Sequence, residues 1–339
     1  NWVHHCTFYR WAYDGYADHR GGLLDLGRAL TAGDESDYNL IEHNIFAYGG
    51  HHTLGNYSKF NVIRYNYFHN ETNPAQWDFE GYRGSITEGP SAGRCLYEGN
   101  RYGWSLASGL SLRSSNNILR HNHFYHQGSA GLQVVASSDN DTADGNRIYH
   151  NVFYNNGHEI EYTGFQCGVY FSNWNGIDPV DNIVQNNIFY QNATGSVCYD
   201  GTFDRPALIT NWDAQDTDPG FVDLSGADPN DATLPDFTLA QDNAAKDKGS
   251  FLTTIASPSG TGETFAVVDA GFFMDGWGVI EGDLIQLANQ SVQARITHVD
   301  YQTNTLTVDT SLTFETGQGV SLAYGGAAPD QGAAEVGAP

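Results

Sequence analysis

The sequence predicts an all-β protein: a right-handed parallel β-helix with three short strands per coil, followed by a small antiparallel β-module. The first observation is an eight-residue phrase, clearest at Asn117 to Phe124, that recurs along the first 200 residues. A repeat of this length is typical of a solenoid, in which each unit buries its apolar edge against its neighbours. The second observation is a change, from about Gly262, to alternating strands separated by tight polar turns.

The phrase predicts two strands and a bend in every coil. Its seven copies start at residues 1, 39, 61, 95, 117, 146 and 182, in steps of 38, 22, 34, 22, 29 and 36 residues. The third and eighth positions are apolar or aromatic, and the sixth is Asn in every copy except the first, which has Cys6. Asn tolerates the left-handed conformation and bonds its own backbone, so we place the bend at this sixth position. The stacked asparagines predict ladders that bond coil to coil.

A third strand in each coil is predicted by glycine-led runs that precede several copies. Examples are residues 109–112, 131–134 and 168–171. Steps of 22 residues suit three short strands, and the longer steps leave room for loops. Amphipathic helical repeats are the competing interpretation, and the Asn, Gly and β-branched content argues against them.

Three regions follow from this pattern. Residues 1–205 form the parallel β-helix. Residues 206–261 are an Asp-, Pro- and Gly-rich connector that we expect to pack along the helix. Residues 262–339 form the small β-strand module. Because the chain opens at Asn1 inside a repeat, we expect further coils or a cap to precede it in the natural protein.

Composition limits the partners. The chain has 15 basic and 40 acidic residues, a net charge of −25, and its only lysines are Lys59, Lys246 and Lys248. Such a surface repels nucleic acid and anionic membranes, and no apolar run is long enough to cross a bilayer. Low lysine and high Asn, Gly and Tyr favour a secreted protein, extracellular or at the cell surface.

The four cysteines are predicted to be buried free thiols. Cys6 and Cys95 lie three coils apart, roughly 14 Å at one strand spacing per coil, which is too far for a disulfide. Cys167 and Cys198 fall in neighbouring coils but in different columns.

With these coils in view, the chain resembles the pectate-lyase-like right-handed parallel β-helix superfamily. The Asn-x-Ile-x-x-Asn-x-Phe coils carry the resemblance. The segments Asp236–Leu239 and Ala328–Glu335 look like the C-terminal region of bacterial secreted β-helix proteins. The superfamily includes polysaccharide lyases, hydrolases, epimerases and adhesins, so the resemblance implies the scaffold and leaves the chemistry open.

Candidate site residues come from columns along the glycine-led strands, where outward side chains stand about 4.8 Å apart, a spacing suited to a polysaccharide. One outward column holds Asp25, Gly55, Thr87, Ser111, Gln133 and Tyr170, and the next holds Tyr57, Arg113, Val135 and Ser172. The loop of residues 69–94 adds further groups able to touch a ligand. The predicted substrate-binding residues are Asp25, Tyr57, Trp77, Asp78, Tyr82, Gln133 and Tyr170.

Cleavage of a uronate polymer by β-elimination needs a base, an acid and a cation that neutralises the carboxylate. Lys59 is the solenoid's lysine and the candidate base, and Arg83, Arg94 or Arg113 are the candidate neutralising groups. Calcium is the candidate cofactor. Its candidate ligands are Glu80 and Glu88, together with Asp139, Asp141 and Asp144 in a segment that resembles a calcium loop with one extra residue. A hydrolase would instead pair carboxylates, such as Asp25 with Asp78 or Glu80.

Two further columns have a structural interpretation. The fourth position of the phrase alternates in charge from Glu42 through Arg64 and Glu98 to Arg120, which predicts a salt-bridge ladder on the outer face. The fifth position carries His5, His43, His121 and His150, which we expect to be solvated turn residues.

The leading hypothesis is a secreted protein that acts on an extracellular polysaccharide, as a lyase-like enzyme. The rival is a non-catalytic structural or adhesive solenoid that binds glycans or associates with copies of itself. The abundant aromatic residues suit either sugar stacking or subunit contacts.

Overall fold

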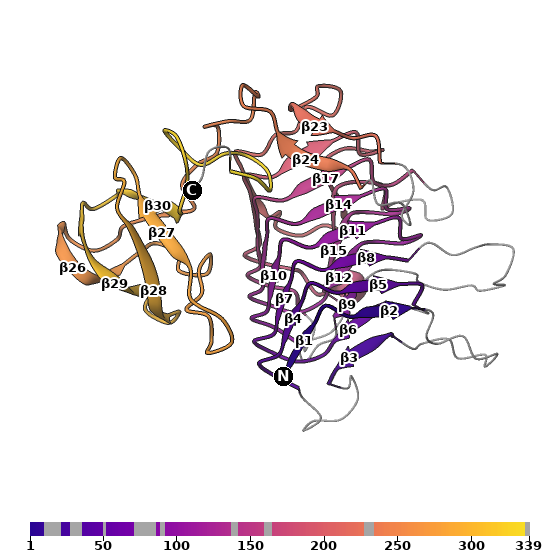
Figure 1. The fold of residues 1–339 in the computed structure, drawn as a ribbon, viewed down its shortest axis with the longest axis horizontal. Coiled ribbons are helices and arrows are strands. Elements are labelled where there is room, and N and C mark those ends of the chain that lie inside the picture. Colours follow the sequence, from indigo (N-terminus) through magenta and orange to yellow (C-terminus); the bar gives the residue numbers. More distant parts are fainter. Residues whose placement is uncertain are drawn as a thin grey trace, which may run out of the picture.

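The protein is a parallel β-helix with an antiparallel β-module beside it (Figure 1). The computed structural model describes residues 1–9, 22–27, 36–49, 52–70, 86–88, 92–136, 142–158, 165–226 and 234–335. Parallel strands wind through three sheets, and the later strands pair antiparallel. The predicted fold class is confirmed. Within the described residues, no helix is long and apolar enough to cross a membrane.

Each coil contributes one strand to each of three parallel sheets, here called sheets A, B and C. Sheet A contains β1 (Trp2–His4), β4 (Leu40–Glu42), β7 (Val62–Arg64), β10 (Leu96–Glu98), β13 (Ile118–Arg120), β16 (Arg147–Tyr149), β19 (Ile183–Gln185) and β22 (Ala207–Ile209). Sheet B contains β2 (Thr7–Tyr9), β5 (Ile45–Ala47), β8 (Tyr67–His69), β11 (Arg101–Gly103), β14 (His123–Tyr125), β17 (Val152–Tyr154) and β20 (Ile188–Tyr190). Sheet C contains β3 (Leu24–Leu26), β6 (Leu54–Asn56), β9 (Ile86–Glu88), β12 (Leu110–Leu112), β15 (Leu132–Val135), β18 (Val169–Ser172) and β21 (Val197–Asp200). A 3-10 turn, η1 (Trp174–Gly176), follows β18.

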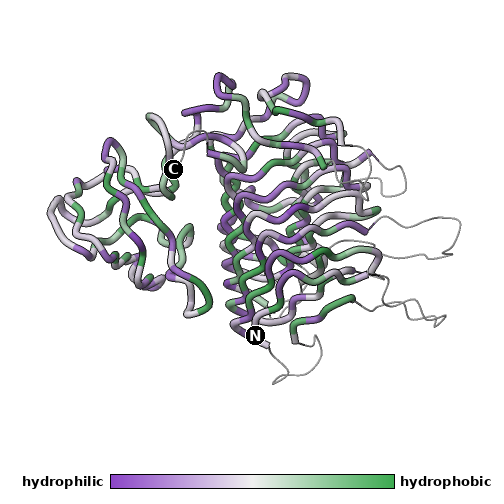
Figure 2. Tube along the Cα trace, in the orientation of Figure 1, coloured by the Kyte–Doolittle hydropathy of each residue, from purple (hydrophilic) through white to green (hydrophobic). Residues whose placement is uncertain are grey.

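The solenoid core is built from the apolar positions of the phrase. Third-position residues pair directly between coils, as Ile63 does with Tyr97. Eighth-position rings stack in one column from Phe8 to Phe189, with successive centroids 4.5–5.2 Å apart. Figure 2 shows the resulting alternation of hydrophobic and hydrophilic residues along each coil. The recurring phrase therefore sets both the coil register and the core.

The sixth-position asparagines stack and bond along the axis. The Asn122 side-chain amide donates to Asn151 Oδ1 at 3.0 Å, and Asn151 donates to Asn187 Oδ1 at 2.9 Å. Equivalent bonds join the side chains from Asn44 to Asn122 and from Asn187 to Asn211. A further stack of buried amides, at Gln127, Asn156, Asn192 and Gln215, lies between sheets B and C and has no counterpart in the eight-residue phrase.

The bend lies one residue earlier than predicted. The fifth-position residues adopt positive φ, from 52° at His150 to 63° at Gly99, whereas the asparagines after them do not. The sixth position is instead occupied by Asn because its amide faces inward and bonds to the backbone and the next Asn. The asparagine does lie next to the bend, as predicted, but its side chain serves to form hydrogen bonds between coils.

The C-terminal module packs against the outer face of sheet A. Its sheet has the strand order β25-β30-β27-β28-β29-β26. The strands are β25 (Thr253–Thr254), β26 (Gly260–Ala266), β27 (Leu284–Leu287), β28 (Gln293–Asp300), β29 (Thr305–Phe314) and β30 (Gly319–Leu322). One buried cluster joins this module to outward residues of sheet A, including Val62, Leu96, Ile118 and Tyr149.

The connector covers the C-terminal part of the outer face of sheet B, over β14, β17 and β20. Two antiparallel strands, β23 (Phe221–Asp223) and β24 (Asp236–Leu239), lie across it (Figure 1). Phe221 and Phe237 pack with Tyr125, Tyr154 and Tyr190 of sheet B in one cluster. Within the described residues, sheet C contributes to neither this cluster nor the one beneath the C-terminal module.

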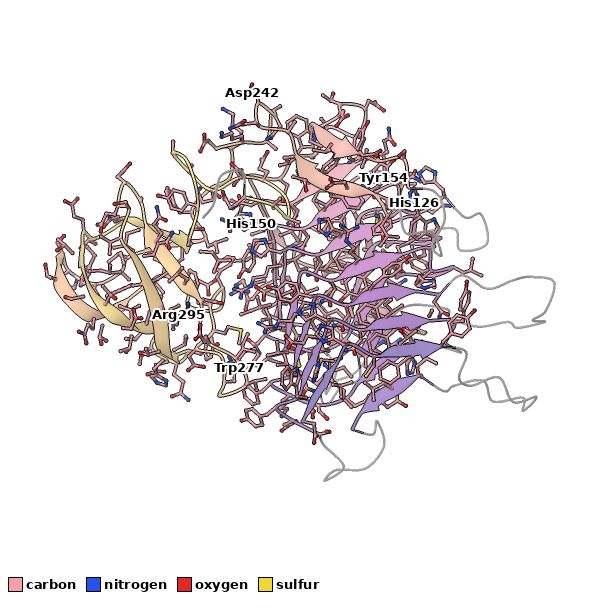
Figure 3. All side chains as sticks on the ribbon, viewed as in Figure 1. His126, His150, Tyr154, Asp242, Trp277 and Arg295 are labelled. Carbon is pink, nitrogen blue, oxygen red and sulfur yellow. A yellow bond between two sulfur atoms is a disulfide. The ribbon has the colours of Figure 1, made fainter. Side chains whose placement is uncertain are left out.

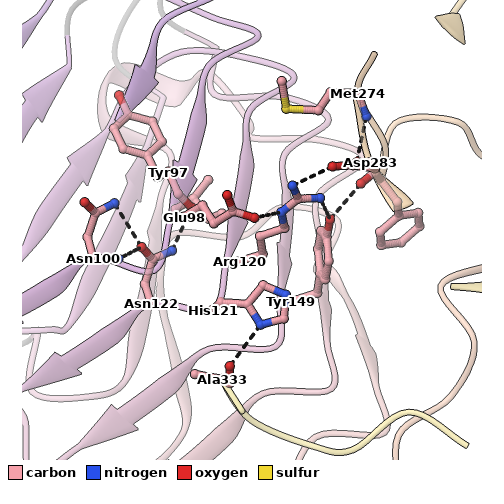
Figure 4. Close-up of polar contacts among 12 residues, drawn as sticks. Tyr97, Glu98, Asn100, Arg120, His121, Asn122, Tyr149, Met274, Asp283 and Ala333 are labelled. Carbon is pink, nitrogen blue, oxygen red and sulfur yellow. Dashed lines mark hydrogen bonds and ion pairs between the residues drawn. The ribbon is translucent and has the colours of Figure 1, made fainter. Parts of the chain in front are cut away.

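The charged column of sheet A is paired as predicted but is not an outer surface throughout. Glu42 bonds Arg64 at 2.7 Å and Glu98 bonds Arg120 at 2.7 Å. Arg120 is only 4% exposed because Asp283 of the C-terminal module covers it and accepts a hydrogen bond at 2.6 Å (Figure 4). Burial alone would raise the pKa of Glu98, but the Arg120 guanidinium holds it below its usual range.

The prediction of solvated histidines is wrong for His121 and His150. His150 is buried and His121 is half-buried beneath the C-terminal tail, where His121 Nδ1 lies 3.0 Å from the Ala333 carbonyl oxygen (Figure 4). Burial, with a contribution from His121, lowers the pKa of His150 to about 3. Both residues lie on turns, but the later chain folds back over them.

The prediction of four buried free thiols is also wrong. Cys167 and Cys198 form a disulfide, Cys6 is an exposed thiol, and Cys95 is a buried thiol. The two bonded cysteines do occupy different columns, since Cys198 pairs with Tyr170. The chain turns at Gly168 just before β18, which leaves the Cys167 and Cys198 Cα atoms 6.1 Å apart.

Candidate active site

Sheet C carries the outward column predicted from the glycine-led strands. Asp25 pairs with Gly55, Gly55 with Thr87, and Thr87 with Ser111. The column continues through Gln133 to Tyr170. The register of this face therefore matches the sequence alignment residue by residue.

Three side chains converge over Gly55 in this column. His52 Nε2 lies 3.0 Å from Asp25 Oδ1. A methyl group on Gly55 would overlap Asp25 Oδ1 and would lie 2.8 Å from the Tyr57 ring and 2.9 Å from His52 Nε2. Gly22, next to His52 in its column, is equally constrained, since a methyl there would lie 2.5 Å from His52 Nε2. Glycine at these two places allows the three functional groups to meet.

The members of this group differ in exposure: the Asp25 carboxylate is accessible, and the His52 ring is buried beneath it. The Asp25 side chain is 45% exposed, whereas His52 is 3% exposed. His52 therefore holds the Asp25 carboxylate from below, and Asp25 faces the outer surface of the sheet. A carboxylate fixed by a buried imidazole is oriented for proton transfer or for binding a sugar hydroxyl.

Tyr57 keeps its proton at neutral pH. Burial and the neighbouring Asp25 carboxylate raise the pKa of Tyr57 to about 12, although the Arg113 charge opposes the shift. The group thus pairs a proton acceptor, Asp25, with a proton donor, Tyr57, on one patch of surface. Environments that separate two neighbouring pKa values are typical of acid–base sites.

Arg113 adds a positive charge to the same face. It lies two coils beyond Tyr57 in the second outward column, on the order of 10 Å away at one strand spacing per coil. Its side chain is half-buried, and its Nε makes no hydrogen bond within the described residues. Because a guanidinium is a planar group suited to carboxylates, Arg113 is a candidate contact for an anionic ligand lying along the strands.

The other predicted catalytic residues with described side chains lie apart from this group. Lys59 is exposed in the bend after Tyr57, and its backbone N–H donates to Asp37 Oδ1 at 2.7 Å. Arg94 packs under the C-terminal module, with its guanidinium 4.5 Å from the Tyr301 ring centroid. Neither makes an ion pair within the described residues, and neither contacts Asp25.

The predicted binding residues farther along sheet C have different surroundings. Tyr170 is 3% exposed and donates to Asp200 Oδ2 at 3.2 Å, beside the Cys167–Cys198 disulfide. Gln133 is half-buried in the outward column between Ser111 and Tyr170. Tyr170 therefore supports the wall of the face, while Gln133 remains a candidate contact.

Several predicted residues lie outside the described residues. They are Trp77, Asp78, Glu80, Tyr82, Arg83, Asp139 and Asp141, and only the backbone of Glu88 is described. Asp144 uses Oδ1 to accept the Val180 N–H at 2.9 Å. Within the described part of the chain, no three His, Cys, Asp or Glu side chains gather as metal ligands. Calcium binding stays a prediction.

His52 is the site residue that the sequence analysis missed. Its equivalents two residues before the inward Leu110, Leu132 and Val169 are Ser108, Ala130 and Cys167, all small and buried. A bulky imidazole in a column of small side chains is the sequence signal that identifies it.

Comparisons with known proteins bear on the fold. Residues 83–227 match the family model described as a right handed beta helix region. No curated protein matches the chain. Three solved structures are similar in fold. The periplasmic alginate epimerase AlgG has 17% identity and a TM-score of 0.38, with 51% of this chain and 38% of that chain covered.

The second is an alginate lyase from Paenibacillus sp. str. FPU-7, with 19% identity, a TM-score of 0.28 and coverage of 48% of this chain and 60% of that one. The third is XylC in complex with xylose, with 10% identity, a TM-score of 0.31 and coverage of 84% and 51%. The chain thus spans about two fifths of the epimerase and three fifths of the lyase. The coils, their register and the family model together identify residues 83–227 as a right-handed β-helix region.

Proposed function

We propose that this protein cleaves a uronate-containing polysaccharide by β-elimination on the outer face of sheet C. The observation that carries the proposal is the convergence of Asp25, His52 and Tyr57 over Gly55, with Arg113 two coils away on the same face. Strands about 4.8 Å apart offer a regular row of side chains to an extended polymer. Asp25, Tyr57 and Arg113 were each predicted as site residues, and His52 completes the set.

Each group has a defined part in the proposed reaction. Arg113 neutralises the uronate carboxylate, which makes the neighbouring C5 proton more acidic. Asp25, oriented by His52, accepts that proton. The electron pair forms the C4=C5 double bond as the C4–O bond breaks, and Tyr57 donates its proton to the departing oxygen.

Local positive charge on sheet C would allow this acidic protein to bind an acidic polymer. The chain carries a net charge of −25, which opposes the approach of a polyanion. Arg113 supplies a half-buried cation on the same face. A bound calcium ion would add further positive charge, and its ligands are proposed among Glu80, Glu88, Asp139, Asp141 and Asp144.

We also propose that the protein acts outside the cytoplasm. The Cys167–Cys198 disulfide supports this, because disulfides persist mainly in oxidising compartments. The low lysine content is consistent with the same location.

The proposal is tested by a screen of uronic-acid polymers for the ultraviolet absorbance of unsaturated products. We expect turnover on at least one polymer, and a roughly 10²- to 10⁴-fold loss of kcat in Asp25→Asn and in Tyr57→Phe. Tyr65→Phe, an exposed tyrosine on the sheet A side, and Asp204→Asn, an exposed carboxylate, are the matched controls and should retain activity. Thermal unfolding checks that every variant is folded.

Two results would count against the proposal. One is the absence of unsaturated product from every uronate polymer. The other is full activity in Tyr57→Phe. Polymer binding without turnover, abolished by Arg113→Gln, would favour the rival glycan-binding solenoid.

A further inference from the structure

A second candidate site lies between the solenoid and the C-terminal module, away from the group over Gly55. It is a cavity of about 150 Å³ whose lining includes Arg94 and Arg147 from the solenoid and Trp277 and Tyr301 from the module. In Figure 3, Trp277 lies on the part of the module that faces the solenoid. The site therefore exists only where the two regions pack together.

The arginines give this cavity an excess of positive charge. Arg147 is paired with Asp269 at 2.8 Å, and its Nη1 also donates to the Asp181 carbonyl at 2.8 Å. Arg94 has no carboxylate partner among the described residues. Two cations against one anion is notable in a chain with 40 acidic and 15 basic residues.

Arg94 is held in a position that leaves its donors free. Its guanidinium lies 4.5 Å from the Tyr301 ring centroid, a cation–π contact that covers one face of the group. The N–H groups at its edge are not engaged in any hydrogen bond within the described residues. Five donors in a planar fork suit an oxyanion with two or more oxygens.

Trp277 and Tyr301 form the module's part of the lining. The Trp277 indole N–H interacts with the Tyr301 hydroxyl, which donates its own proton to the Phe273 carbonyl at 2.9 Å. The two aromatic side chains therefore support each other, and the donors open to a ligand in this cavity are those of the arginines.

Nearby acidic groups are already occupied. Asp269 pairs with Arg147, and its Oδ1 accepts the Gly271 N–H at 2.8 Å. Asp275 accepts the backbone N–H groups of Trp277 and Val299 at 3.1 and 3.2 Å. Neither carboxylate is directed at Arg94 in an ion pair.

We propose that Arg94, with the remaining donors of Arg147, binds a small oxyanion. The chemistry fits the carboxylate of an acidic monosaccharide or a free inorganic anion such as sulfate or phosphate. The cavity volume limits the ligand to about that size, since pockets for larger ligands measure roughly 300–1,000 Å³. Because the site requires both regions, the bound anion would also tie the module to the solenoid.

Isothermal titration calorimetry of the full chain with glucuronate, sodium sulfate, sodium phosphate and glucose tests this. We expect at least one anion to bind and glucose not to bind. Arg94→Gln should weaken the anion roughly 10- to 100-fold, as expected for loss of a charged hydrogen bond. Trp277→Phe keeps an aromatic ring in the lining and leaves both arginines in place, so it should change the anion affinity far less than Arg94→Gln does.

Matched controls separate this site from the site on sheet C. Arg113→Gln should leave anion affinity unchanged, whereas Arg94→Gln should leave polymer turnover unchanged. Stronger binding of glucuronate than of sulfate and phosphate identifies an acidic sugar as the ligand, and the reverse identifies the inorganic ion. The proposal is overturned if no anion binds, if glucose binds as tightly as the anions, or if a folded Arg94→Gln protein retains full anion affinity.

Discussion

Replacing Asn122 by alanine should loosen the middle of the solenoid by several kcal/mol. Its side-chain amide donates to the Tyr97 carbonyl at 2.8 Å and to Asn151 Oδ1 at 3.0 Å. Its Oδ1 accepts the backbone N–H and the side-chain amide of Asn100 at 3.0 and 3.1 Å. The residue is fully buried, so water cannot replace these bonds in the folded coil.

The magnitude follows from which partners are left without a bond. Asn151 Oδ1 keeps the Asn122 backbone N–H, and the Asn100 amide keeps the Ile63 carbonyl. The Asn100 N–H loses the side chain that satisfies it, which costs about 1–3 kcal/mol. The Tyr97 carbonyl stays in the ladder between β10 and β13 and loses only a second bond, worth about 1 kcal/mol, so the expected total is about 3 kcal/mol.

Hydrogen exchange measured by mass spectrometry suits a repeat protein, whose coils need not unfold together. Protection of peptides covering residues 96–125 should fall by roughly 10²-fold in Asn122→Ala. The matched control is Asn211→Ala at the partly exposed end of the ladder, where water can substitute and the loss should be much smaller. Equal losses in the two variants would show that the stacked amides do not stabilise the coils as argued.

Two further perturbations act on the buried interface with the C-terminal module. Asp283→Ala leaves Arg120 paired with Glu98 but removes its partner in the module. The free energy that holds the module on the solenoid should fall by about 3–5 kcal/mol, and Trp277 should become exposed at a lower urea concentration. Acid should destabilise the same region. The pKa of His150 is about 3 in the folded protein, against an ordinary value near 6.5. The unfolded state therefore binds more protons than the folded state as the pH falls below 6.5. At pH 5 this amounts to about 2 kcal/mol, and His150→Asn should remove that part of the loss between pH 7 and 5. Burial raises the pKa of Glu335 to about 8, which has the opposite effect on stability, so His150→Asn is compared with the parent protein at each pH. The same acid dependence of stability in both proteins would refute the role given to His150.

The repeat alone was enough to predict the coils and their register. Ile63, Tyr97 and Leu119 could be placed in one column because period-two alternation and the recurring Asn leave a single alignment that buries every apolar position. The same alignment brought Asp25, Gly55 and Ser111 onto one face. The coil register and the outward column follow from the local pattern of side chains, so they can be predicted from the sequence alone.

What the repeat could not supply was the position of the chain after residue 205. His150 belongs to a turn column and resembles its solvated counterparts, yet the tail near Gly332 covers it. Arg94 looked like a neutralising residue for sheet C, but Tyr301 lies against it. Contacts across 100 to 200 residues have no periodic signature, so equivalent positions in the repeat acquire different environments.

That same covering of the scaffold favours sheet C as the functional face. The C-terminal module buries Leu96 and Ile118 on sheet A, and the connector buries Tyr154 and Tyr190 on sheet B. Sheet C enters neither cluster in the described chain, and it is also where Asp25 stands 45% exposed above a buried histidine. The later chain packs over parts of sheets A and B, and the proposed site lies on the sheet that this packing leaves accessible at Asp25.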